Sequence, residues 1–107
     1  MPGNNIERES DMTVYAIIIK EEPTHTQAEY DKYLEVAGAN RGDHAIKPLA
    51  MYGETVALEG AGADGVVILE FADMDAAKAW YYSDGYQKAV PHRLASAKFR
   101  SFLVQGM

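Results

Sequence analysis

The side chains best suited to chemistry concentrate in one segment of this sequence. Residues 79–87 read Ala-Trp-Tyr-Tyr-Ser-Asp-Gly-Tyr-Gln, so the only tryptophan and three of the seven tyrosines lie between Trp80 and Tyr86. Such a cluster combines a large apolar area with polar tips, and it can close a core or line a pocket. We therefore name Trp80, Tyr81, Ser83 and Tyr86 as candidate substrate-binding residues.

Three of these residues also have a purely structural interpretation. Trp80 shares a helical register with other apolar residues and fits a core position. Ser83 suits the N-cap of a following helix, where a hydroxyl accepts a bond from a free backbone amide. Tyr86 fits packing and pocket lining equally well.

Arg93 is the only arginine near this cluster. Its planar fork of donors matches the two oxygens of a carboxylate ligand, so we include it among the substrate-binding candidates. The structural alternative is an ion pair with Glu70 or Asp84.

His44, His92 and Glu70 are the candidates for proton transfer. His44 follows Asp43 in a polar loop, and His92 precedes Arg93. An imidazole changes charge near neutral pH and can act as a general base, although a loop histidine is usually only a polar surface group. Glu70 becomes a third candidate if its strand end is buried. The histidines lack a ligand spacing such as i, i+4, so no metal site is predicted, and no cofactor is implied.

Composition narrows the class of protein. A chain of 107 residues suits one domain with a single core. The net charge of −6 and the scattered lysines and arginines argue against nucleic-acid and membrane partners. The chain has no cysteine and no long apolar run, which favours a cytoplasmic protein. Residues 1–12 hold one isolated apolar side chain and are expected to form a flexible tail before a domain at 13–107.

The body of the chain alternates strand and helix patterns. A helix is expected from Thr26, which with Glu29 makes a capping box, to near Gly38. A second helix is expected from an N-cap at Asp73, interrupted at 83–85, with a short helical piece to Val90 and a new turn at Pro91. Strands are predicted at 13–19, 49–59, 66–71 and 99–104. The order β-α-β-β-α-β predicts an α+β, ferredoxin-like fold with a four-stranded antiparallel sheet.

This fold leaves one sheet face without cover, because two helices can cover only the other. The first and third strands are apolar on both faces, so the second face must also be buried. The simplest cover is a second copy of the chain related by a two-fold axis. We therefore predict a homodimer through the sheet face.

One glycine-rich motif does not indicate a dinucleotide-binding site. Residues 60–65 match G-x-G-x-x-G, but a strand follows them, whereas a dinucleotide site requires a helix there. The glycines are interpreted as hairpin-loop residues.

Several segments together resemble the DUF1330 family over residues 13–106. They are the 79–87 segment, Pro91-His92-Arg93-Leu94-Ala95-Ser96-Ala97, Glu59-Gly60, Leu69-Glu70-Phe71 and the closing Leu103-Val104-Gln105-Gly106. The resemblance implies a ferredoxin-like chain that pairs into a dimeric α+β barrel. That superfamily includes cofactor-free monooxygenases, muconolactone-isomerase-type enzymes, stress-responsive proteins and haem-binding members.

The second predicted strand departs from the family pattern. Met51 stands where the family usually has an arginine, which implies a less charged or differently placed ligand. Tyr52 adds bulk beside it and is a further substrate-binding candidate.

The resulting prediction is a homodimeric protein that binds a small molecule. One version of this prediction is an enzyme, namely a cofactor-independent isomerase, cyclase or monooxygenase that acts on a compact organic substrate. The alternative is a non-catalytic ligand-binding or stress-response structural dimer.

Overall fold

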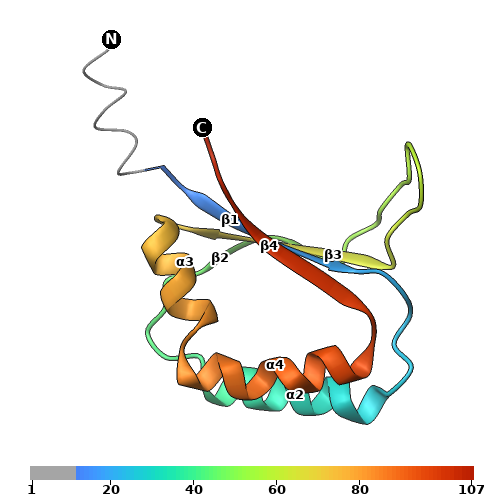
Figure 1. The fold of residues 1–107 in the computed structure, drawn as a ribbon, viewed down its shortest axis with the longest axis horizontal. Coiled ribbons are helices and arrows are strands. Elements are labelled where there is room, and N and C mark those ends of the chain that lie inside the picture. Colours follow the sequence, from blue (N-terminus) through green and yellow to red (C-terminus); the bar gives the residue numbers. More distant parts are fainter. Residues whose placement is uncertain (1–11) are drawn as a thin grey trace.

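The computed structural model describes residues 12–107, so the predicted tail lies outside the described residues except for Met12. Within these residues, three helices and four strands follow one another (Figure 1). They are β1 (Val14–Lys20), α2 (Gln27–Ala39), β2 (Lys47–Met51), β3 (Gly65–Phe71), α3 (Met74–Tyr81), α4 (Asp84–Ser96) and β4 (Phe99–Gln105). The predicted β-α-β-β-α-β order is confirmed, with the second helical region divided into α3 and α4.

The four strands form one antiparallel sheet in the order β2-β3-β1-β4. The two apolar strands, β1 and β3, lie at its centre, and the helices lie on one side of the sheet (Figure 1). The predicted α+β, ferredoxin-like fold is therefore confirmed.

The two faces of the sheet differ in burial. On the face toward the helices, Val14, Ala16 and Ile18 of β1 are buried. On the opposite face the alternate residues of β1 and β3 are only partly covered, and Phe102 and Val104 of β4 are 48% and 44% exposed. The outer face is thus apolar and open in the single chain.

The second strand is shorter than the predicted 49–59. It ends at Met51, because Tyr52 adopts a left-handed backbone conformation with φ of 57° that turns the chain out of the strand. Residues 52–64 then form a long protruding excursion before β3 (Figure 1). Gly60 and Gly62 of the glycine motif lie within this excursion, and Gly65 is the first residue of β3. A strand and not a helix therefore follows the motif, which confirms that it does not form a dinucleotide site.

Two of the three predicted helix caps form. Asp73 accepts a bond of 2.8 Å from the Ala76 amide, and the Ser83 hydroxyl accepts one of 3.3 Å from the Tyr86 amide. The predicted capping box at Thr26 is wrong, although the helix does begin there. The Thr26 side chain makes no cap bond, and its Oγ1 lies 2.8 Å from His25 Nδ1 instead.

The last helix is longer than predicted. α4 runs without a break from Asp84 through Pro91 to Ser96. Proline has a φ compatible with a helix and forfeits one hydrogen bond. Because Gln87 and Pro91 are both exposed, the carbonyl left free can be hydrated, and the buried residues Val90 and Arg93 hold the helix in place on either side.

A column of aromatic rings connects the sheet to the helices. The Phe71 ring lies 5.2 Å from that of Trp80, which lies 4.3 Å from that of Tyr86. Tyr86 in turn meets the edge of Tyr33 on α2 at 6.2 Å. Trp80 is 7% exposed and Tyr86 5% exposed, so the structural interpretation of Trp80 as a core residue is confirmed.

The helix pair α2 and α4 depends on a close approach at Gly85. A Cβ atom there would lie 2.8 Å from the Asn40 backbone oxygen and 2.6 Å from its Cβ. A Cβ atom added at Gly38, on α2, would have no such neighbouring atom within 4 Å.

We predict that Gly85→Ala lowers the free energy of unfolding by about 1–3 kcal/mol, because the helices must move apart. Gly38→Ala is the matched control and should raise it by about 0.5–1 kcal/mol through helix propensity. Chemical denaturation of both variants measures the difference. Equal effects of the two substitutions would refute the proposed close packing at Gly85.

Candidate functional site

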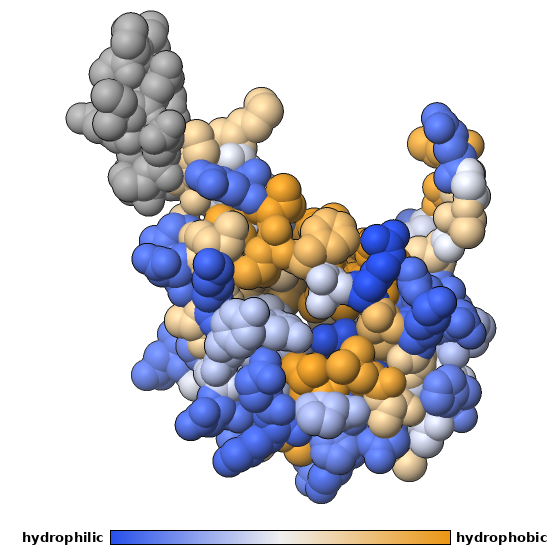
Figure 2. All heavy atoms as spheres, in the orientation of Figure 1, coloured by the Kyte–Doolittle hydropathy of each residue, from blue (hydrophilic) through white to orange (hydrophobic). Residues whose placement is uncertain are grey.

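Two spaces lie between the sheet and the helices, and the larger of the two, here called the larger pocket, is bordered by α3 and the strands β1 and β4 and has a volume of about 450 Å³. Figure 2 shows a hollow on this side of the molecule, between the sheet and the helices. Its wall is formed by residues from three elements and the helix break: Ala16, Ile18, Met74, Lys78, Trp80, Tyr81, Tyr82, Ser101, Phe102 and Leu103. A separate and more open hollow of about 660 Å³ is lined mainly by residues of the 52–64 excursion.

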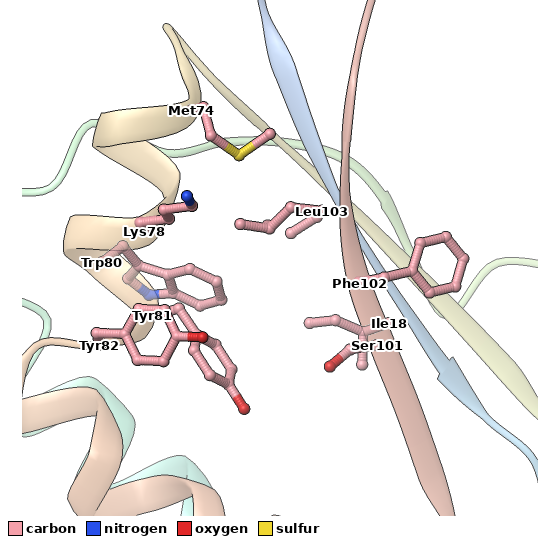
Figure 3. Close-up of a pocket in the computed structure, with 10 residues that line it drawn as sticks. Ile18, Met74, Lys78, Trp80, Tyr81, Tyr82, Ser101, Phe102 and Leu103 are labelled. Carbon is pink, nitrogen blue, oxygen red and sulfur yellow. The ribbon is translucent and has the colours of Figure 1, made fainter.

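The side chains of this pocket approach from two sides. Trp80 and Tyr81 project from α3 toward Leu103 and Ile18 on the sheet, whereas the Phe102 ring points to the other side of β4 (Figure 3). Lys78 supplies an ammonium group and Ser101 a hydroxyl. An apolar, aromatic wall with a few polar groups suits a compact organic ligand.

A smaller cavity of about 90 Å³ lies on the opposite side of Ile18, under the end of β2. Ile18 lines both spaces, so it separates them. The residues around the smaller cavity come from the sheet and from both long helices: Ile18, Tyr30, Tyr33, Met51, Tyr52, Val67, Leu69 and Arg93.

Arg93 is the most unusual of these residues, because it is 2% exposed. Its guanidinium carbon lies 5.0 Å from the centre of the Phe99 ring and 5.8 Å from that of Tyr33. Its Nε and Nη1 atoms are buried and have no hydrogen-bond partner in the part of the chain that the structure describes. The predicted structural alternative, an ion pair with Glu70 or Asp84, is not formed within the described residues.

Tyrosine hydroxyls surround this arginine in two pairs. The Tyr33 and Tyr86 hydroxyls are 2.8 Å apart, and Tyr30 donates to Tyr52 at 3.2 Å across the gap between α2 and the end of β2. Burial is the main cause that raises the pKa of Tyr33 and of Tyr52 well above the ordinary value of 10.0, and the neighbouring phenols add to it. Both phenols therefore stay neutral at physiological pH.

The predicted site residues divide between these spaces. Trp80 and Tyr81 line the larger pocket, and Tyr52 and Arg93 line the smaller cavity. Tyr86 is part of the aromatic column between the layers. The Ser83 hydroxyl donates to the Trp80 carbonyl at 2.7 Å as well as capping α4, so its polar capacity is largely used in the helix break.

The three proton-transfer candidates line neither space. His92 Nδ1 lies 2.7 Å from Glu29 Oε2 and ties α4 to α2. Glu70 pairs with Tyr15 and Lys47 in the sheet register, on the face away from the helices. His44 lies in the loop before β2, beside Gly42.

Several lining residues had no signal in the sequence. Lys78 and Ser101 are ordinary polar residues, and their role depends on α3 lying opposite β4. The spacing of Tyr33 indicates only a place on the apolar face of its helix, yet its hydroxyl meets that of Tyr86, 53 residues away. Such contacts follow from packing of distant elements and not from local spacing.

Two kinds of feature are not found in the described part of the chain. Within residues 12–107, no group of three His, Asp or Glu side chains could hold a metal ion. In the same range, no helix is long and apolar enough to cross a membrane.

The comparisons with known proteins agree with this architecture. The family model described as a domain of unknown function (DUF1330) matches residues 13–107. No curated protein matches the chain significantly.

Solved structures with the same fold share little sequence with the chain. A protein of unknown function from Rhodopseudomonas palustris has a TM-score of 0.70 at 15% identity, over 98% of this chain and 90% of its own. A dimeric ferredoxin-like protein of unknown function from Thermobifida fusca has a TM-score of 0.56 at 10% identity, over 89% and 92%. SnoaB, a cofactor-independent oxygenase from Streptomyces nogalater, has a TM-score of 0.55 at 13% identity, over 91% and 94%.

The raised pKa of Tyr33 predicts a loss of stability in alkaline solution. Above pH 10 the unfolded chain releases the phenol proton while the folded chain retains it, so the free energy of unfolding falls as pH rises. Tyr33→Phe should remove up to about 1.4 kcal/mol per pH unit of this slope.

Denaturation between neutral pH and the alkaline range measures this slope. Tyr82→Phe, at a position that is 68% exposed, is the matched control and should keep the slope of the unmodified protein. An unchanged slope in Tyr33→Phe would contradict the burial of this hydroxyl.

Proposed function

The chain belongs to the DUF1330 family, and on that premise we propose that it is a cytoplasmic, homodimeric α+β barrel protein that binds a compact organic molecule. The observation that carries the proposal is the pocket of about 450 Å³ between α3 and β4, with Trp80 and Tyr81 on its wall. Its volume falls in the range of small-molecule sites. The absence of cysteine fits a reducing compartment.

The lining indicates what kind of ligand this pocket takes. The indole and phenol rings offer flat apolar surfaces to a ring or a short hydrocarbon. Lys78 can attract a partial or full negative charge, and the Ser101 hydroxyl can donate or accept a hydrogen bond. We therefore expect a single-ring aromatic or lactone-type compound with a polar substituent.

The enzymatic form of the proposal is a cofactor-independent isomerase, cyclase or monooxygenase. It is supported by the similar fold of SnoaB, which is a cofactor-independent oxygenase. Lys78 and the Tyr81 hydroxyl are the groups in the pocket wall that could stabilise an enolate-like charge.

The alternative is a non-catalytic ligand-binding or stress-response dimer. It is favoured by the position of His44, His92 and Glu70, none of which lines either space. Without a base in the pocket, binding need not lead to turnover. Product analysis after incubation with a bound ligand separates the two forms.

The proposed dimer rests on the uncovered sheet face. Partly covered Ile17, Ile19 and Ile68 adjoin the exposed Phe102 and Val104 on this face. A continuous apolar surface of this kind marks an interaction site, and a two-fold axis lets the same face cover itself. The similar fold of a dimeric protein from Thermobifida fusca supports a dimer of this fold.

Ligand binding in the larger pocket can be followed through Trp80, which is the only tryptophan. Neutral probes such as phenols and small lactones should change its emission saturably. Ser101→Phe fills the pocket and should weaken binding by about tenfold or more, whereas Ser101→Ala removes only one hydroxyl and should weaken it by about threefold. Equal affinity in Ser101→Phe would show that the probes bind elsewhere.

Substitution of the outer face tests the dimer. Phe102→Lys replaces an apolar ring by a charge in each copy, and it should weaken association by about 3 kcal/mol or more, which is over about 100-fold. Leu94→Lys, on α4, is the control because Leu94 is similarly exposed at 53%. Sedimentation over a concentration series measures both. A monomeric unmodified protein would refute the dimer.

A further inference from the structure

We propose that the smaller cavity is an anion site in which Arg93 binds the carboxylate of a short aliphatic acid. The cavity lies apart from the larger pocket, so this inference goes beyond the proposed function and does not require the larger pocket to be occupied. The Arg93 guanidinium carries a charge that no other described residue neutralises.

The guanidinium of Arg93 is buried but not neutralised. Arginine stays protonated in proteins. The ion pairs formed within residues 12–107 do not include Arg93, and its Nε and Nη1 atoms have no hydrogen-bond partner. Removing a cation from water without a partner is strongly unfavourable. An anion beside it would satisfy both the charge and the free donors.

The surroundings of the guanidinium hold it in place without using its donors. The Phe99 and Tyr33 rings lie 5.0 and 5.8 Å from its central carbon. Aromatic faces attract a cation but accept no conventional hydrogen bond from it. A carboxylate is the natural complement, because a guanidinium can bind its two oxygens through parallel N–H···O bonds.

The dimensions of the cavity limit the size of the acid. A volume of about 90 Å³ corresponds to about three water molecules at roughly 30 Å³ each. Acetate and propionate are of this size. A second wall of Ile18, Val67 and Leu69 is apolar, which suits a methyl or ethyl group and disfavours a strongly hydrated phosphate.

The cavity also offers neutral donors and an entrance. Tyr33 and Tyr52 line it with hydroxyl groups, and no Asp or Glu lies among the lining residues to repel an anion. Tyr52 is 40% exposed, and the Tyr30–Tyr52 hydrogen bond of 3.2 Å joins α2 to the end of β2 beside the cavity. Breaking this single bond is a local way to admit a small acid.

NMR of the Arg93 Nε–H group in the full chain tests the site. Sodium acetate and sodium propionate should shift this resonance saturably, while sodium chloride and sodium phosphate at equal ionic strength should not. Arg93→Met should weaken acetate and propionate binding by about 10- to 100-fold, through loss of a charged hydrogen-bond donor. Arg41→Met, at an exposed arginine, is the control and should bind as the unmodified protein does.

Each outcome of this titration decides a different part of the proposal. An Nε–H resonance that no acid moves would overturn the proposal and leave Arg93 as a packing residue held by aromatic rings. Equal responses to chloride and phosphate would overturn the choice of a carboxylate. If Arg93→Met does not fold, the titration of the unmodified protein still decides. Because neutral probes report on Trp80 and aliphatic acids on Arg93, failure at one site is distinguishable from failure at the other.

Discussion

The structure depends on the aromatic column that spans the gap between the sheet and the long helices. Phe71 on β3, Trp80 on α3, Tyr86 on α4 and Tyr33 on α2 come from four different elements, and successive ring centres lie 4.3–6.2 Å apart. Rings of this size contribute a large share of the buried apolar area in a small domain. They also fill only the middle of the interlayer space. The regions on either side are left open, one beside Trp80 and the other beside Tyr33.

The two open regions differ in chemistry because different residues border them. Toward β4 the wall includes Trp80, Tyr81 and Leu103, and Lys78 also lines it. This space is large enough for a ring-sized molecule. Toward β2 the wall includes Arg93 and two neutral phenols, and the space accepts only a few heavy atoms. Ile18 lies between them. In the function that we propose, the same interior layer stabilises the fold and binds the ligand, and the outer sheet face pairs with a second copy.

Local patterns predicted the element order, the apolar character of the first and third strands, the caps at Asp73 and Ser83, and the core position of Trp80. The errors arose where tertiary structure overrides local preference. Nothing in the sequence shows that Tyr52 adopts a left-handed conformation and ends β2, or that α4 continues through Pro91 on an exposed face of the helix. The Arg93 guanidinium has no partner among the described residues because no acidic side chain there reaches it. That is a property of the whole fold, and residue spacing does not contain it.

The central claim is that the interior beside the aromatic column is hollow and accessible to small molecules. The most direct test is methyl NMR of Ile18, whose side chain borders both spaces. Ile17, Ile19 and Ile68 face the other side of the sheet and serve as internal references. We predict that small lactones and propionate shift the Ile18 methyl signals saturably and leave the reference signals in place. Ile18 signals that respond to none of these compounds, nor to dissolved xenon, would contradict the account.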